Sequence, residues 1–170
     1  MANMDHLIEQ VLTKIRQREH QSFEVDYLDK TLPPDDQVFT DFANVSINNV
    51  TINLLIDLYR VDTANDWVHW LLQGISFQVN FTFNISQYMV NFIPKKMLLN
   101  WPVKFVVDKG RPVVTFNRKT VSRSDVAALP DKAVLVVTTA QHLTTEATEV
   151  SRLKQITIQI RTDEDCIWQK

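Results

Sequence analysis

The feature that most constrains the fold is an alternation that runs without a break through residues 75–86. Large apolar side chains take every second position, and small polar ones lie between them; the apolar ones are Ile75, Phe77, Val79, Phe81, Phe83 and Ile85. Successive side chains of a strand point to opposite faces, so the pattern predicts a long β-strand with one buried face. We therefore expect the chain to fold around a sheet.

The other face of this strand is polar but uncharged. A solvated strand face is usually guarded by Lys or Glu, and none occurs here. Two interpretations stay open: simple exposure of a central strand, or contact with a second polar surface. On the second interpretation we predict an oligomer interface that includes Gln78, Asn80, Thr82 and Asn84.

Further segments show either strand-like alternation or a buried-looking apolar run. We expect strands at residues 45–47, 50–58, 133–139 and 155–161, and a hairpin of 103–107 with 112–116 that turns at Gly110. Short helices are expected at 66–74, capped by Asn65 or Asp66 and ended by Gly74, at 122–129, as a capped helix that starts at Ser122, and at 144–153. Regular alternation of strands and helices is not evident, which disfavours a parallel doubly wound sheet. The predicted fold is α+β and mainly β: an antiparallel sandwich or curled sheet of about seven strands, with an N-terminal amphipathic helix and two or three short helices.

Residues 4–19 read as that amphipathic helix, because their apolar residues recur at helical spacing. One role for the apolar face is packing across the sheet. The other is self-association, with Leu7, Val11 and Ile15 at the interface. The helix is close to electrically neutral, which argues against binding to an anionic membrane.

The chain of 170 residues is treated as a single domain, residues 1–170. Its parts are the helix 4–19, an acidic, proline-containing linker or arm at 21–41, a β-rich core at 45–161 and a polar tail at 162–170. No apolar run is long enough for a transmembrane segment, and no secretory signal is present. We expect a cytoplasmic protein.

Charge is segregated along the chain although the total is only −2. Residues 95–123 hold eight basic residues and one acid, a local charge of +7, and residues 19–66 hold ten acids and two basic residues, a local charge of −8. Two partners fit this polarity. The basic region of one copy could meet the acidic region of another, or the basic region could bind RNA or another anionic surface.

The predicted anion or nucleic-acid contacts are the basic side chains of this region. They are Lys95, Lys96, Lys109, Arg111, Arg118, Lys119 and Arg123. Aromatic rings that could stack on bases are nearby, but Phe105 and Phe116 fall where the hairpin needs its core face.

Motifs for catalysis are missing. With only two glycines, the chain cannot build a phosphate-cradling loop, and its four histidines and single Cys166 stand in no metal-ligand spacing. We predict no catalytic residue, no metal and no cofactor.

The leading functional hypothesis is a non-enzymatic assembly or interaction module, of the kind found in viral structural, matrix-like or accessory proteins, that self-associates through charge-complementary surfaces. One alternative is RNA binding through residues 95–123. Another is a β-rich carrier of an apolar ligand or lipid, with the strands 50–58 and 75–85 around a dry interior. An enzyme whose site is assembled from distant loops is the least favoured alternative.

Overall fold

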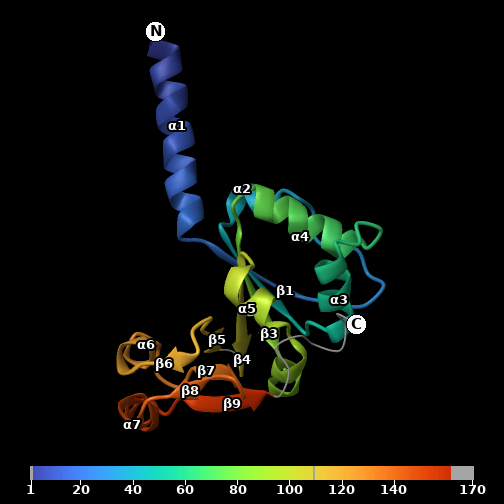
Figure 1. Ribbon diagram of the computed structural model, residues 1–170. Helices are drawn as coiled ribbons and strands as arrows, with labels where there is room; N and C mark the ends of the chain where they lie inside the picture. Colours follow the sequence, from blue (N-terminus) through green and yellow to red (C-terminus); the bar gives the residue numbers. More distant parts are fainter. Residues whose placement is uncertain (1, 109, 162–170) are drawn as a thin grey trace. The chain divides into compact units, whose positions relative to one another are not determined.

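The computed structural model describes residues 2–108 and 110–161, and the chain divides between Phe83 and Asn84 into two compact units (Figure 1). The N-terminal unit runs through α1 (Ala2–Glu19), β1 (Ser22–Asp26), α2 (Val38–Asp41), β2 (Asn44–Asn48), α3 (Ile52–Arg60), α4 (Asp66–Ser76) and β3 (Asn80–Ile85), the strand in which the division falls. The C-terminal unit runs through η1 (Gln87–Phe92), α5 (Lys95–Asn100), β4 (Val103–Val107), β5 (Arg111–Thr115), β6 (Thr120–Val121), α6 (Arg123–Ala127), β7 (Val134–Thr138), β8 (His142–Leu143), α7 (Thr145–Leu153) and β9 (Thr157–Arg161).

The sheet of the N-terminal unit is parallel. Strand β2 pairs with β1 on one side and with β3 on the other, so that Asn44 lies opposite both Ser22 and Asn80. Parallel neighbours need a crossover connection, and the crossovers here carry α2 between β1 and β2, and α3 with α4 between β2 and β3. This unit is therefore built from two consecutive βαβ connections.

The C-terminal unit has the strand order β4-β5-β7-β9. Strands β4 and β5 form an antiparallel hairpin, whereas β5 with β7 and β7 with β9 are parallel pairs whose crossovers carry α6 and α7. The same crossovers contain the short strands β6 and β8, which pair with each other in parallel.

Each unit has its own apolar core. In the N-terminal unit, α3, α4 and β3 turn their larger apolar residues inward; these are Leu54, Leu55, Leu58, Trp67, Val68, Trp70, Leu71, Phe81 and Phe83. In the C-terminal unit a cluster joins β6, β7, α6 and α7 and consists of Val121, Val126, Ala133, Leu135, Val137, Ala147 and Ile156.

The expected antiparallel sandwich or curled sheet is wrong. The architecture is mixed α/β, with mostly parallel strand pairs and helices between them. Strand β7, Val-Leu-Val-Val-Thr, shows why the parallel order escaped sequence reading, since all five of its residues are buried. A strand covered on both faces is a continuous apolar run, and such a run does not reveal the direction of its neighbours.

The predicted strand at 50–58 is also wrong, because these residues form most of helix α3. The Thr51 side chain caps this helix and accepts a hydrogen bond from the Leu54 amide at 3.3 Å. Leu54, Leu55 and Leu58 are its buried residues, spaced as one helical face requires. The alternation with Ile52 and Ile56 resembled a strand by coincidence.

Only the second half of the predicted strand 75–86 is extended. Helix α4 continues to Ser76, and the chain then turns at Gln78, whose φ is 59°. Gly74 does not end the helix, as we had expected, but lies inside it and is buried. Beyond the turn the prediction of a buried face holds: Phe81, Phe83 and Ile85 of β3 are buried.

Residues 21–41 are only partly a linker, because β1 and α2 fall within them. Several local predictions are confirmed. Helix α1, the β4–β5 hairpin, β7, β9, α6 and α7 all occur where the sequence placed them, and Asn65 caps α4 through its side chain.

Candidate functional site

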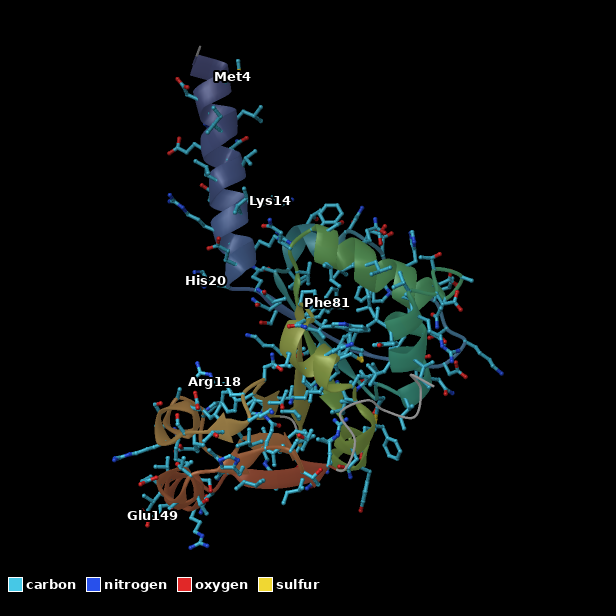
Figure 2. The ribbon with its side chains drawn as sticks, in the orientation of Figure 1. Met4, Lys14, His20, Phe81, Arg118 and Glu149 are labelled. Carbon is cyan, nitrogen blue, oxygen red and sulfur yellow. The ribbon has the colours of Figure 1, made fainter. Side chains whose placement is uncertain are left out.

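Helix α1 carries six apolar side chains on one face and leaves all of them exposed. Met4, Leu7, Ile8, Val11, Leu12 and Ile15 are 46–68% exposed. Figure 2 shows side chains that project from the helix around the labelled Met4. We call these six residues the apolar stripe of α1. Of the two roles that the sequence allowed for this face, packing across the sheet does not occur in the structure.

The C-terminal end of α1 is attached to the rest of its unit. The Arg18 guanidinium donates a hydrogen bond to the Phe77 carbonyl at 2.7 Å, and Lys14 lies 3.8 Å from the Asp41 carboxylate. A groove of about 220 Å³ runs along this junction, lined by Val11, Lys14, Ile15, Arg18, Phe39, Thr40 and Phe77. Phe77 is 46% exposed, so the stripe continues onto an exposed aromatic ring.

Charges along α1 are ordered. Asp5 is in the first turn, and Arg16 and Arg18 are in the last turn, which also suits the helix dipole. Asp5 and Arg16 are separated by about three turns, so both project from the same flank of the helix. This flank borders the stripe on the side of Leu12.

Of the polar residues that the sequence assigned to an interface, Gln78 and Asn80 are exposed. The Asn80 amide donates to the Asn44 side-chain oxygen at 3.3 Å across the β2–β3 pair, and Thr82 and Asn84 are half-buried. Gln78 lies in the preceding turn. The sequence also missed Phe77, which it assigned to a buried strand face.

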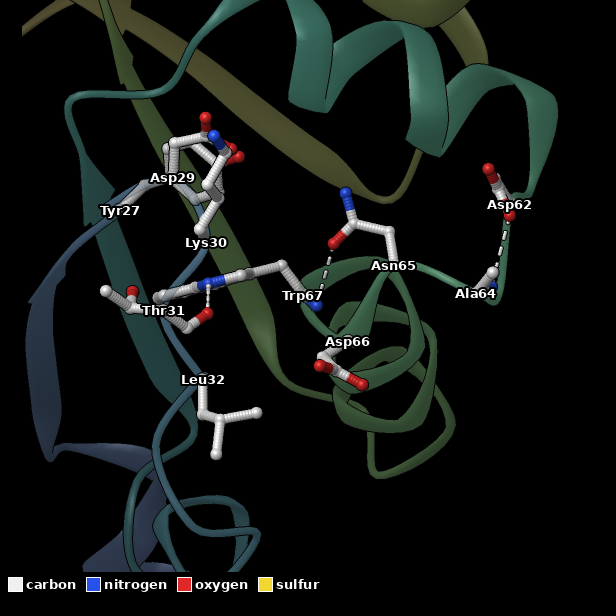
Figure 3. Close-up of a pocket in the computed structure, with 10 residues that line it drawn as sticks. All are labelled: Tyr27, Asp29, Lys30, Thr31, Leu32, Asp62, Ala64, Asn65, Asp66 and Trp67. Atoms are coloured by element: carbon white, nitrogen blue, oxygen red, sulfur yellow. Dashed lines mark hydrogen bonds between the residues drawn. The ribbon is translucent and has the colours of Figure 1, made fainter.

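A polar pocket of about 370 Å³ opens in the N-terminal unit beside the start of α4 (Figure 3). Its lining is Tyr27, Asp29, Lys30, Thr31, Leu32, Asp62, Ala64, Asn65, Asp66 and Trp67. Most of the polar groups that point into it already have partners. The Trp67 indole donates to the Thr31 carbonyl at 2.8 Å, the Asn65 oxygen accepts from the Trp67 amide at 3.0 Å, and the Ala64 amide donates to Asp62 at 3.1 Å.

The chemistry of this pocket is limited. Burial and the nearby Asp29 carboxylate raise the pKa of Tyr27, so its phenol stays protonated at neutral pH. The Thr31 hydroxyl donates to the Leu28 carbonyl at 2.7 Å, and the ten lining residues include no serine, cysteine or histidine.

The predicted anion-binding residues that the structure describes differ in their surroundings. Lys95 is buried, Lys96 is exposed, and Lys109 lies outside the described residues. Arg111 is committed to the C-terminal unit itself: its guanidinium donates to the Lys132 carbonyl at 2.9 Å, to Thr157 at 2.5 Å and to Asp108 at 3.2 Å.

The remaining three basic residues lie close together in the chain, around β6. Lys119 and Arg123 are exposed, and Arg118 forms an ion pair with Asp125 at 3.3 Å. Phe105, considered for stacking, is buried in the core, as expected. For the lipid-carrier alternative, the supporting strand at 50–58 is helix α3.

Among the described residues, no group of three histidine, cysteine or acidic side chains could hold a metal ion. His69 is exposed on α4, and Cys166 lies outside the described residues. None of the helices described in the structure is both long and apolar enough to span a membrane.

The chain was compared with models of known protein families, and a match was found. Residues 6–157 match the model of the PDU_like family, described as "Putative propanediol utilisation". The match covers most of the chain, which therefore belongs to this family. No curated protein and no solved structure matches the chain.

Proposed function

We propose that this member of the propanediol utilisation family is a non-enzymatic assembly module that self-associates through the apolar stripe of α1. The family is named for propanediol utilisation, and this process is the context of the proposal. The single observation that supports self-association is the stripe itself, because all six of its side chains lie exposed on one face of an 18-residue helix.

The exposed apolar surface of the stripe indicates a binding partner. Scattered apolar side chains are ordinary on a protein surface, but a contiguous apolar patch usually marks an interaction site. Burying such a side chain completely stabilises by about 1.5–3 kcal/mol, so covering the half that remains exposed contributes on the order of 1 kcal/mol for each residue. An isolated helix of this length is marginal in water, and a docked partner would also stabilise the helix itself.

The charge-complementary surfaces expected from the sequence offer a second route to self-association. The acidic segment belongs to the N-terminal unit and the basic segment to the C-terminal unit. Part of the basic segment is occupied by contacts within its own unit, as the Arg111 bonds illustrate. All six residues of the stripe remain at least 46% exposed, and we therefore place the interface there.

Light scattering after size-exclusion chromatography tests the proposal. We compare the unmodified chain with a variant that carries Leu7→Ala, Val11→Ala and Ile15→Ala. Alanine is the strongest helix former, so the helix is kept while apolar area is lost. The matched control carries His6→Ala, Gln10→Ala and Gln17→Ala on the opposite face of α1.

We expect the unmodified chain and the control to elute with the mass of an oligomer and the stripe variant to elute as a monomer. Circular dichroism of the stripe variant at high concentration checks that α1 and the two units still fold. A monomeric unmodified chain at about 100 μM, a hundredfold above a micromolar dissociation constant, would contradict self-association. So would a stripe variant that keeps the oligomeric mass.

A further inference from the structure

We propose that the partner of α1 is the α1 helix of a second copy, and that the two helices lie antiparallel. This inference rests on the proposed self-association and names its partner and geometry. The charged residues of α1 bear on the choice between a parallel and an antiparallel arrangement, which the apolar stripe alone does not decide.

Asp5 and Arg16 lie on one flank of α1, and this flank favours an antiparallel pair. When two identical helices pair antiparallel, the same flank of each helix meets the same flank of the other, with the chain direction reversed. Asp5 of one copy then lies level with Arg16 of the other, and the two-fold symmetry repeats the pair. Both side chains are exposed in the structure.

A parallel pair has no such match. It places each flank against the opposite flank of the second helix, where Lys14 is the basic residue. Lys14 of one copy then approaches the flank of the other that carries Arg16 together with the acids Asp5 and Glu9, so that repulsions and attractions both occur. The antiparallel arrangement instead places both Asp5–Arg16 pairs on the Leu12 side of the stripe, while Lys14 keeps its own partner, Asp41, at 3.8 Å.

The remaining exposed apolar groups also favour an antiparallel pair. Phe77 lies beside the C-terminal end of α1, and Met4 lies at the N-terminal end of the stripe; both are exposed. An antiparallel second helix brings its own Met4 to the level of Arg18, next to Phe77. Both groups are then covered by one contact, whereas a parallel helix leaves Met4 far from either Phe77.

The net charge of α1 does not favour a lipid surface as the partner of the apolar stripe. The helix has three acids, Asp5, Glu9 and Glu19, and three basic residues, Lys14, Arg16 and Arg18, so its net charge is zero. Helices that lie on anionic membranes are usually rich in Lys and Arg on the polar face. A neutral helix with ends of opposite charge is instead complementary to a reversed copy of itself.

Disulfide trapping separates the possible arrangements. The background carries Cys166→Ser, which removes the only cysteine of the chain. Single cysteines are then placed by Leu7→Cys, Val11→Cys or Ile15→Cys on the stripe, with Thr13→Cys on the opposite face as the control. Each full-length protein is oxidised alone, and Leu7→Cys is also mixed with a size-tagged Ile15→Cys protein.

In the antiparallel pair Val11 lies near the symmetry axis, so we expect Val11→Cys to link to itself. Leu7 of one copy lies level with Ile15 of the other, and the mixture should give the mixed dimer. Leu7→Cys alone should link poorly, because its two copies are offset by about 12 Å along the helix axis, beyond the reach of a disulfide.

Three outcomes overturn the inference, and they are distinguishable. Strong self-linking of both Leu7→Cys and Ile15→Cys, without the mixed dimer, means a parallel pair; the antiparallel geometry is then wrong and self-association stands. An oligomer that forms no disulfide from any stripe position places the interface elsewhere. A monomer in light scattering that gives no disulfide overturns the proposed function as well.

Discussion

At the scale of single residues, Gly74 shows a requirement that the sequence alone had assigned to the wrong cause. The residue lies within α4, its φ is not in the left-handed region, and it is buried. A Cβ at this position would overlap the Phe81 ring and come 2.8 Å from the Phe39 ring. Glycine is present because two aromatic side chains pack directly onto the helix backbone.

This packing makes a prediction for Gly74→Ala. In an open helical site the change would stabilise by about 1 kcal/mol, because alanine is the better helix former. Here we expect a loss of about 1–3 kcal/mol in the free energy of unfolding, since both rings must move in a close-packed core. Urea denaturation measures the difference.

The control for this prediction is His69→Ala, an exposed position of the same helix. It should change the unfolding free energy by no more than about 0.5 kcal/mol. If Gly74→Ala were instead as stable as the unmodified chain or more so, the close approach of Phe39 and Phe81 would not be the reason for glycine.

At the scale of elements, helix α6 begins with a reciprocal cap, and the sequence Ser-Arg-Ser-Asp predicts this cap. The Asp125 carboxylate accepts from the Ser122 amide at 2.9 Å and from the Ser122 hydroxyl at 2.7 Å, and the Ser122 hydroxyl accepts from the Asp125 amide. These bonds, with a smaller contribution from Arg118, hold the pKa of Asp125 below its ordinary value.

The lowered pKa has a definite consequence for stability. A carboxylate whose pKa falls on folding stabilises the folded state above its unfolded pKa of about 3.9, and this contribution is lost as the pH falls through the folded pKa. We expect Asp125→Asn to lower the urea midpoint at pH 7. The difference from the unmodified chain should shrink as the pH is lowered below about 4.

Asp131→Asn is the control, because the Asp131 carboxylate is 76% exposed and its partner Lys154 is 3.7 Å away. It should give a small difference from the unmodified chain at pH 7. An Asp125→Asn difference that stays the same from pH 7 to pH 3 would show that the charge of the cap does not stabilise α6.

Elements also show where local sequence patterns mislead. In α3 the apolar residues satisfy a period of two as well as a helical period, and the choice depends on Leu55, which only the helical pattern places on the buried face. In residues 75–86 the period of two extends across the end of α4, the turn at Gln78 and β3. The apolar pattern within a short stretch of sequence cannot distinguish a helix from a strand at these two places.

At the scale of the whole molecule, the two proposed routes to self-association respond differently to salt. Contacts between the acidic and basic segments are screened as the ionic strength rises, whereas apolar contacts are not weakened. We expect the oligomeric mass to persist when sodium chloride is raised from about 50 mM to about 1 M, with at most a modest change from the Asp5–Arg16 pairs.

The measurement is light scattering across this range at constant protein concentration, with the stripe variant as the monomer reference. Dissociation to the monomer at high salt would favour the acidic and basic segments as the interface instead of α1. The absorbance ratio at 260 and 280 nm, recorded in the same runs, reports whether nucleic acid accompanies the protein.

The sequence by itself determined the features that depend on near neighbours. The amphipathic period of α1, the caps at Asn65 and Ser122, the β4–β5 hairpin and the buried face of β3 were all readable, because each is decided by residues within one or two turns. Tertiary structure alone decided the rest. The parallel strand order, the reason for Gly74 and the exposure of the α1 stripe depend on which distant faces meet, and a local period specifies a face without specifying its neighbour.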